Sequence, residues 1–309
     1  MSDAAPSPEG PRSYRNWRAF VAGKPLFSQA EIPIYSDVSL TVPDSDDLGP
    51  YKLKHAFPAE LRDPVLVLLV HDHLDPGDLP RMDTTKTEGF TGASSGDEVA
   101  ALLSLSLGRR LLAGSATRTC FQGKQDWTIF GDRDRPTFFR PTATRWFGHK
   151  RSVLPRATVD DAKVTTAHLS TFPKIQPSAA TALVRAARLY RDALWIVETE
   201  PELAWLLLVS ALEVAAVHQH VETPLPDILR LSKPKLAERL DAINSSLTEE
   251  VAKELSRELR ATARFLGFMG RHLPPEPDLR PPQWARIDWS PGPMKKAFEK
   301  IYKYRSLAL

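Results

Sequence analysis

The sequence is almost free of cysteine, with Cys120 alone among 309 residues. A single cysteine cannot form a disulfide within the chain, and it excludes a zinc site built from several cysteines. We therefore predict a protein of the reducing cytoplasm. Cys120 itself is interpreted as a small buried apolar residue rather than as a nucleophile.

Long hydrophobic runs are also missing. The longest apolar stretch covers residues 203–212 and is interrupted only by Ser210, and even when extended to Val217 it is too short to cross a bilayer. The first 16 residues are polar and rich in proline, and they lack the apolar segment of a signal peptide. These absences predict a soluble protein without a membrane partner.

Neither sign of charge dominates, since 41 Lys and Arg residues against 38 Asp and Glu residues leave a net charge of +3. Such a weakly basic balance permits contact with nucleic acid but does not argue for it. Glycine is scarce, with 15 residues, whereas the 27 prolines indicate long irregular connections. The length is sufficient for two domains, each with its own core.

The first half of the chain is predicted to be a mixed α+β domain. Residues 1–13 are expected to form a disordered tail, and residues 14–175 a domain of unknown role that could sense a trigger. The unbroken Val and Leu run at residues 65–70 indicates a buried strand. Further strands are predicted at residues 32–35, 38–42, 127–130 and 138–139. A capping box at residues 95–98 predicts a helix over residues 99–112.

From residue 178 onward the pattern is helical, and residues 178–309 are predicted to form an all-α bundle. The predicted helices cover residues 178–199, 203–220, 235–243, 249–270 and 294–309. From residue 203 to 217 the only polar residues are Ser210 and Glu213, which places this helix at the centre of the bundle. The predicted fold class is therefore α+β, a β-rich mixed domain followed by a helical bundle.

Three pieces of the second half form a recognisable series. The first is Glu-Leu-Ala-Trp-Leu at residues 202–206, followed by Val-Ser-Ala-Leu-Glu at residues 209–213. The second is the basic helix at residues 249–271, and the third is Ile-Tyr-Lys-Tyr-Arg-Ser at residues 301–306. In this order and spacing, the pieces resemble the HEPN superfamily and in particular its ApeA-like branch.

The resemblance implies a metal-independent RNA endonuclease of the toxin or phage-defence type, without a cofactor, that acts as a homodimer. In that family the 2′-hydroxyl of RNA attacks the adjacent phosphate, an arginine holds the phosphate and a histidine transfers the proton. Carried over to this sequence, Arg305 would bind the phosphate, Ser306 would be its polar companion and Glu213 would anchor Arg305. The signature histidine would follow beyond Leu309, so we expect this polypeptide to be a fragment of a longer chain and to be inactive.

Arginines recur at helical spacing in two stripes, which together would suit a track for an RNA backbone, with the first stripe and Lys303 as the predicted RNA-binding residues. The first stripe consists of Arg257, Arg260 and Arg264, and the second of Arg185, Arg188 and Arg191. Lys303 adds a positive charge on the last predicted helix. The alternative is that both stripes are solvated faces without a ligand.

Three other interpretations remain open. The bundle could be a non-catalytic nucleotide-binding or dimerisation scaffold, in which Arg305 is a structural cation near a helix end. His71 and His73 could chelate a metal from one side of a strand, although polar residues at a strand end are the commoner explanation. Residues 92–96 match the letters of a nucleophile elbow with Ser94 as nucleophile, but a capped turn is favoured because no buried strand precedes them.

Overall fold

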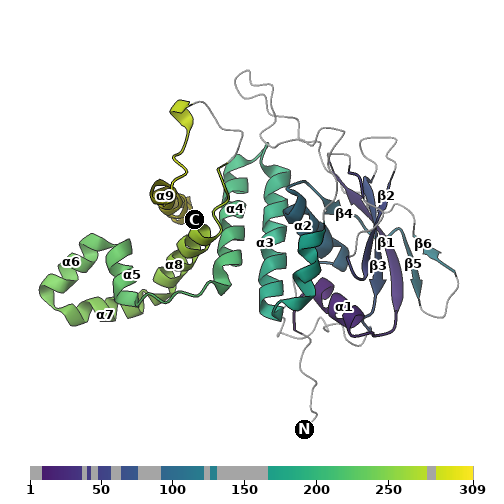
Figure 1. The fold of residues 1–309 in the computed structure, drawn as a ribbon, viewed down its shortest axis with the longest axis horizontal. Coiled ribbons are helices and arrows are strands. Elements are labelled where there is room, and N and C mark those ends of the chain that lie inside the picture. Colours follow the sequence, from purple (N-terminus) through teal and green to yellow (C-terminus); the bar gives the residue numbers. More distant parts are fainter. Residues whose placement is uncertain are drawn as a thin grey trace, which may run out of the picture. The chain divides into compact units, whose positions relative to one another are not determined.

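The computed structural model describes residues 9–36, 40–42, 48–56, 64–75, 92–121, 126–130, 166–276 and 283–308 (Figure 1). These residues combine an antiparallel sheet with many helices, so the fold is mixed α+β, as predicted. The chain divides into two compact units, an N-terminal unit (Met1–Ala211) and a C-terminal unit (Leu212–Leu309). The boundary between the two units falls inside helix α4 (Pro201–Ala215). The change in composition from which the domains were predicted lies earlier, near residue 177.

The sheet of the N-terminal unit has the strand order β2-β3-β1-β5-β6, and β4 also pairs with β1. Its strands are β1 (Ser28–Tyr35), β2 (Tyr51–His55), β3 (Leu66–Asp72), β4 (Leu112–Ala113), β5 (Arg118–Phe121) and β6 (Thr128–Ile129). The strands predicted at residues 32–35, 65–70 and 127–130 are confirmed by the overlapping strands β1, β3 and β6, with shifted ends. The strand predicted at residues 38–42 lies partly, and that at residues 138–139 wholly, outside the described residues.

The register of the sheet explains its core. Ile32 of β1 pairs with Leu68 of β3, which pairs with Leu53 of β2, so one apolar row crosses three strands. All three side chains are buried. Side chains alternate between the two faces along each strand, so every second apolar residue lies on the same face as this row. These side chains form the core beneath the helices.

Helices cover this apolar face of the sheet. The N-terminal unit contains α1 (Arg12–Val21), α2 (Ser95–Leu107), the 3₁₀ helix η2 (Ala167–Lys174) and α3 (Pro177–Ile196). Figure 1 shows α2 between the sheet and α3. Buried alanines, among them Ala101 of α2 and Ala187 of α3, allow the two helices to approach closely. This packing is why α3 belongs to the N-terminal unit although its sequence begins the helical half.

The predicted capping box of α2 is displaced by one residue. The N-cap is Ser94, whose hydroxyl accepts a hydrogen bond from the backbone N–H of Asp97, and the side chain of Asp97 completes the box. The helix ends at Leu107, five residues earlier than predicted, because Gly108 adopts the left-handed conformation (φ 62°) that terminates helices.

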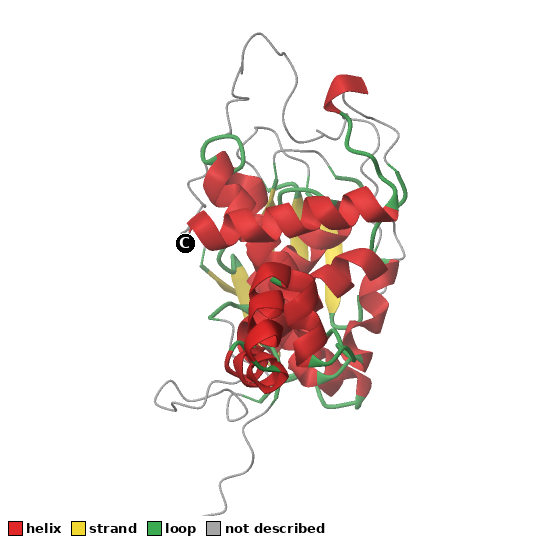
Figure 2. Ribbon diagram, turned by 90° about the vertical axis from the view of Figure 1, so that its left-hand side faces the viewer, coloured by secondary structure: helices red, strands yellow, loops and turns green. Residues whose placement is uncertain are grey.

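In the described part of the C-terminal unit, every regular element is helical (Figure 2). After the end of α4 these are η3 (Ala216–His218), α5 (Leu225–Ser232), α6 (Pro234–Ile243), α7 (Ser245–Glu254), α8 (Ser256–Arg271), η4 (Gln283–Ala285) and α9 (Pro291–Ala308). The predicted single helix at residues 249–270 is wrong, because the chain breaks at Leu255 between α7 and α8. Helix α5 was not predicted.

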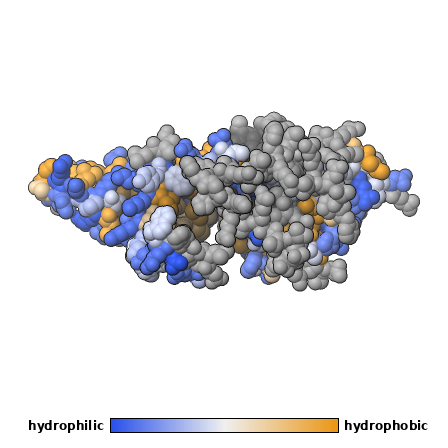
Figure 3. Space-filling model, turned by 90° about the horizontal axis from the view of Figure 1, so that it is seen from above, coloured by the Kyte–Doolittle hydropathy of each residue, from blue (hydrophilic) through white to orange (hydrophobic). Residues whose placement is uncertain are grey.

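A small core holds the helices α5 to α8 together. It is built from Ile228, Leu229, Ala237, Ala252 and Leu259. The outer surface of these helices is mixed, and Figure 3 shows apolar and hydrophilic side chains side by side at its left-hand end, where Figure 1 places α6. Leu231 and Ile243 are among the exposed apolar residues.

Helix α4 is less buried than its sequence predicts. Only Ala204, Val209 and Ala211 are buried, and Leu203 is 49% exposed. The segment Pro201–His218 is also the one helical stretch of the described residues that is long and apolar enough to cross a membrane, with 22% of it buried. More of this helix is exposed than its predicted place at the centre of a bundle implies. The reason is that a helix apolar on all sides carries no pattern to show how many of its faces are covered.

Candidate functional site

Arg305 and Glu213 form an ion pair in the C-terminal unit, with 2.7 Å between Nη2 and Oε2. Glu213 lies in the last turn of α4, and Arg305 lies near the end of α9. The side chains are 27% and 20% exposed. A carboxylate that is largely removed from water needs a cationic partner, and Arg305 supplies it. The contact that the resemblance implies is therefore present, and the catalytic role of the pair stays a prediction.

The packing face of α9 brings Arg305 to this position. Met294 and Phe298, four residues apart, are both buried, and Tyr302 follows one turn later on the same face. Arg305 comes three residues after Tyr302, so its side chain lies on the same side of α9, one turn beyond the last residue of this largely apolar face. The helix thereby directs a guanidinium toward the end of α4.

Tyr302 completes the cluster around Glu213. Its ring lies 5.0 Å from that of Phe265 in α8. Burial raises the pKa of Tyr302, and the charge of Glu213 and a hydrogen bond to its carboxylate raise this pKa further. The contact with Thr262, whose hydroxyl donates to the carbonyl oxygen of Glu258, and the charge of Arg305 lower this pKa. Side chains from α4, α8 and α9 therefore meet at one carboxylate.

The guanidinium of Arg305 keeps donors that Glu213 does not use. Its Nε is buried and, among the residues that the structure describes, has no hydrogen-bond partner. An arginine carries five N–H donors in a planar fork that matches carboxylate and phosphate oxygens. The backbone of Ser306 continues α9, and the side chain of Ser306 lies outside the description, so its role as the polar companion stays a prediction.

The first arginine stripe forms one exposed face of α8. Arg257 and Arg260 are exposed, Arg264 is half-buried, and Leu259 and Phe265 are buried on the opposite side of the helix. The stripe extends to a residue that the prediction omitted, since Arg271 is exposed and lies two turns beyond Arg264 on the same face.

The length and charge of this face suit a polyanion. From residue 257 to residue 271 it extends over about 21 Å at 1.5 Å per residue. Within the described part of the chain, none of its four arginines forms an ion pair. Lys303 is exposed on α9, the helix that packs against α8. We call Arg257, Arg260, Arg264 and Arg271 the α8 arginine face.

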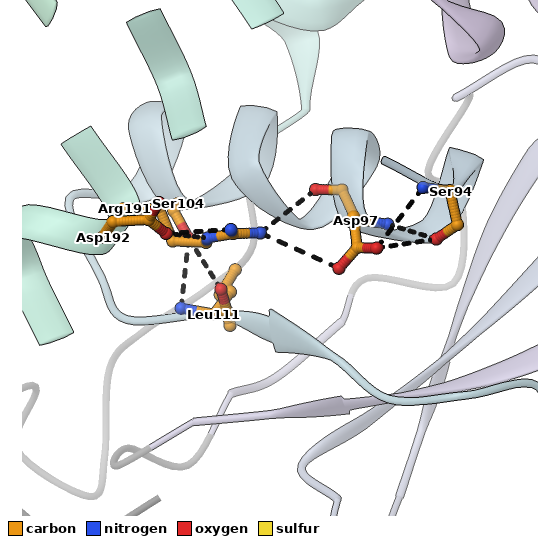
Figure 4. Close-up of polar contacts among 6 residues, drawn as sticks. All are labelled: Ser94, Asp97, Ser104, Leu111, Arg191 and Asp192. Atoms are coloured by element: carbon orange, nitrogen blue, oxygen red, sulfur yellow. Dashed lines mark hydrogen bonds and ion pairs between the residues drawn. The ribbon is translucent and has the colours of Figure 1, made fainter. Parts of the chain in front are cut away.

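The second arginine stripe is not a shared solvated face. Arg185 is exposed, but Arg191 is buried and contacts Asp192 at 2.8 Å and Asp97 at 4.0 Å (Figure 4). The prediction that this stripe contributes to an RNA-binding track is therefore wrong. The close packing of α3 on α2 turns the third arginine toward the first turn of α2, where its charge is neutralised within the protein.

Of the two histidines proposed as metal ligands at the end of β3, His73 is engaged elsewhere. The Nδ1 atom of His73 is 2.7 Å from the carbonyl oxygen of Lys24, and the carboxylate of Asp72 pairs with Arg12 at 2.7 Å. Burial, and then the charge of Lys52, lower the pKa of His71. Among the described residues no group of three or more His, Cys, Asp or Glu side chains could hold a metal ion. Nothing in this part of the chain therefore supports the metal-site interpretation.

Ser94 is exposed and acts as the N-cap of α2. Its hydroxyl donates to Asp97 Oδ2 at 3.0 Å and accepts from the backbone N–H of Asp97 at 3.1 Å (Figure 4). Cys120 lies in β5, where it is only partly buried. The hydroxyl of Ser94 is engaged in the cap of α2, as expected for a capped turn rather than for a nucleophile elbow.

The chain matches no family model, no curated protein and no solved structure. The resemblance to the HEPN superfamily therefore stays a prediction from the sequence pieces. That cluster consists of Glu213, Thr262, Phe265, Tyr302 and Arg305, which we call the Glu213 cluster. Thr262, Phe265 and Tyr302 were not predicted as site residues, and only the spacing of Tyr302 from Arg305 in the sequence could have indicated one of them.

Proposed function

We propose that the C-terminal unit binds RNA and that Arg305 holds a phosphate at the Glu213 cluster, in the manner of a metal-independent endoribonuclease of the toxin or phage-defence type. The ion pair of Arg305 with Glu213 is the observation that carries this proposal. It puts an arginine at a fixed place on α9, the helix that packs against α8, and α8 carries its arginine face on its exposed side. Lys303 would add a further phosphate contact from α9.

The cleavage chemistry needs one more group. The 2′-hydroxyl must lose its proton as it attacks phosphorus, and the leaving 5′-oxygen must gain one, which is work for a side chain with a pKa near neutrality. Among the described residues no histidine contacts Arg305 or Glu213. We therefore expect RNA binding without cleavage from the residues seen in the Glu213 cluster.

The binding part of the proposal has a quantitative test in its salt dependence. For single-stranded RNA the slope of log K against log salt is about −0.7 for each phosphate neutralised. Four arginines on the α8 arginine face thus predict a slope of roughly −3. The measurement is the fluorescence anisotropy of a labelled single strand of about 12 nucleotides, with EDTA present, at several salt concentrations.

Variants make this test specific. Arg257→Gln, Arg260→Gln and Arg264→Gln should each make the slope less steep by about 0.7 to 1. Arg185→Gln removes an exposed arginine from the N-terminal unit and serves as the matched control. If the control changed the salt slope as much as the three variants do, the binding would reflect the total charge of the protein rather than the α8 arginine face. The absence of any salt-dependent binding by the wild-type chain would remove the proposal.

The catalytic part is tested by supplying a histidine. A chain extended beyond Leu309 with a histidine should cleave RNA in the presence of EDTA, and the same chain with Arg305→Ala should not. Cleavage that survives the loss of Arg305 would assign the activity to other residues. Binding without any cleavage would favour the non-catalytic nucleotide-binding or dimerisation scaffold. The ion pair of Arg305 with Glu213 is also compatible with that scaffold, because it gives Arg305 a structural partner.

Two further features belong to the proposal. A homodimer is implied by the HEPN resemblance, and sedimentation equilibrium of the chain with and without RNA tests it. A cytoplasmic setting is favoured by the lone Cys120.

A further inference from the structure

We infer that Trp284 is a stacking site for an unpaired base of the RNA whose phosphates lie along the α8 arginine face. The inference depends on the RNA binding proposed above. Trp284 lies in η4, within the segment that joins α8 to α9. Its ring would touch the ligand but none of the reacting atoms, so it is a binding residue and not a catalytic one.

The exposure of Trp284 sets it apart from the other large apolar residues. Its exposed fraction is 87%, the highest among those of the described residues, and Ile287 in the same segment is 53% exposed. Tryptophan in a folded protein usually buries most of its ring and finds a partner for its indole N–H. Figure 1 shows η4 apart from the packed helices α8 and α9. The ring of Trp284 therefore offers nearly its whole surface to a ligand.

The segment that carries Trp284 is fastened close to α9. The indole N–H of Trp289 donates to the carbonyl oxygen of Pro274 at 2.9 Å, which joins the residues just before α9 to those just after α8. The backbone N–H of Ser290 donates to Asp288 at 2.9 Å. Trp284 is five residues from Trp289, so its backbone lies within about 18 Å of that fastened residue. A ring presented in this way needs little further ordering when a ligand binds, which favours affinity.

Positive charges flank this segment on both sides. Arg271, the last residue of α8 and of the α8 arginine face, precedes it, and Lys295 and Lys296 follow it near the start of α9. All three are exposed, and within the described part of the chain none of them forms an ion pair. An aromatic ring between cations suits single-stranded RNA, because the phosphates pair with the cations and an unstacked base covers the ring. An apolar protein surface could also cover the ring, but it would take these charges out of water without a partner.

One strand can extend from the α8 arginine face to Trp284. The face is about 21 Å long, and the segment begins where the face ends at Arg271. A strand of about 12 nucleotides spans about 40 Å even at the 3.4 Å spacing of a stacked helix. Some of its bases can therefore lie beyond Arg271 while other nucleotides contact the face. Base-paired RNA keeps its bases stacked inside the duplex, where the ring cannot reach them.

The experiment compares substitutions of Trp284 that keep or remove the aromatic ring. In the anisotropy measurement with the strand of about 12 nucleotides, Trp284→Ala and Trp284→Leu should weaken binding about tenfold, the effect of one lost stacking contact, and Trp284→Phe less than about threefold. Ile287→Ala, at an exposed position of the same segment, is the control and should change the affinity less than about twofold. Urea unfolding of the four variants checks that the fold is retained.

Two further ligands separate stacking from charge. Inorganic polyphosphate carries the negative charge without bases, so calorimetry should give Trp284→Ala and wild type the same affinity for it. A strand with 2-aminopurine at alternate positions gives a spectroscopic readout, because the fluorescence of this base falls when it stacks on an aromatic ring. Wild type should quench this fluorescence, and Trp284→Ala should quench it less.

The outcomes are distinct. Equal affinities of wild type and Trp284→Ala for the strand overturn the inference and leave the proposed function intact. Full affinity in Trp284→Leu also overturns it, because the contact would then be apolar without stacking. An equal loss for RNA and for polyphosphate overturns it as well, since the ring would then support the segment rather than a base. A wild-type chain that binds no RNA overturns the proposed function and the inference together.

Discussion

The carboxylate of Glu98 accepts a hydrogen bond of 2.7 Å from the backbone N–H of Ser13, and both residues are buried. This bond joins the first turn of α2 to the first turn of α1, where backbone N–H groups have no partner within their own helix. Glu98 was expected to be part of the cap of α2. The structure uses Asp97 for that cap and frees Glu98 to hold another helix.

Replacing Glu98 should loosen α1. Glu98→Ala leaves the buried N–H of Ser13 without its acceptor and should lower the free energy of unfolding by about 1–3 kcal/mol. Urea denaturation measures the loss. Glu238→Ala, at an exposed position of α6, is the control and should change stability by less than about 0.5 kcal/mol. Similar values for both variants would contradict the role assigned to Glu98.

Arg191 should matter more for stability than Arg185. Its side chain is 7% exposed, but its partners Asp97 and Asp192 are 36% and 48% exposed, so solvent screens part of the interaction. Arg191→Met should therefore cost about 1–2 kcal/mol, less than a fully buried pair would. Arg185→Met should cost less than about 0.5 kcal/mol. Thermal unfolding of the two variants in parallel tests the difference, and an equal change would mean that Arg191 is only a surface cation.

Two helical glycines should respond to alanine with opposite signs. A Cβ at Gly96 would lie 2.7 Å from Cδ1 of Ile32, whereas a Cβ at Gly267 would meet only Gln219, at 3.7 Å. Gly267→Ala should stabilise the protein by about 0.5–1 kcal/mol through helix propensity. Gly96→Ala should destabilise it by about 1–3 kcal/mol through overpacking, and Ile32→Val should relieve part of that loss because it removes Cδ1. Stabilisation by Gly96→Ala would contradict the packing of α2 on β1.

Stability should fall at alkaline pH because of Tyr51. Burial raises the pKa of Tyr51, and the charge of Glu98 raises this pKa further, against the effect of a hydrogen bond from Asn16. The folded pKa lies above the unfolded one, so the unfolded chain binds fewer protons above about pH 10 and stability decreases as pH rises. Between about pH 9 and pH 11, the stability advantage of wild type over Tyr51→Phe should shrink by about 1.4 kcal/mol.

Urea unfolding at several pH values measures this effect. Tyr304→Phe, at an exposed position, should give a curve parallel to that of wild type. If Tyr51→Phe also ran parallel to wild type, the buried hydroxyl would not be the titrating group.

Much of the local structure is readable from the sequence where neighbouring residues decide it. The Val and Leu run predicts β3 because a strand buried on both faces needs no alternation. The sequence did not predict helices α1 and α5, because each is short and follows a proline in a polar segment. The break at Leu255 was missed because the helical pattern continues through it, and only packing around the core of α5 to α8 shows where the axis changes.

The residues of the candidate site were also hard to predict from the sequence, because their contacts join distant segments. Both arginine stripes have helical spacing, yet one is an exposed face and the other ends in a buried ion pair, because Asp97 comes from a distant segment. The contact of Glu213 with Arg305 was expected only through the resemblance. Tyr302 could not be assigned from the sequence, since its partners Phe265 and Glu213 lie on two other helices.

The distance along the chain between Glu213 and Arg305 affects when the Glu213 cluster can exist. Synthesis proceeds from the N-terminus, so the ribosome adds about 90 residues after Glu213 before Arg305 is made, which takes roughly 5–20 s. During that interval the carboxylate has no guanidinium to pair with and must stay hydrated. The nascent chain therefore carries the α8 arginine face before it carries a completed cluster, so the RNA binding proposed for this face would come first.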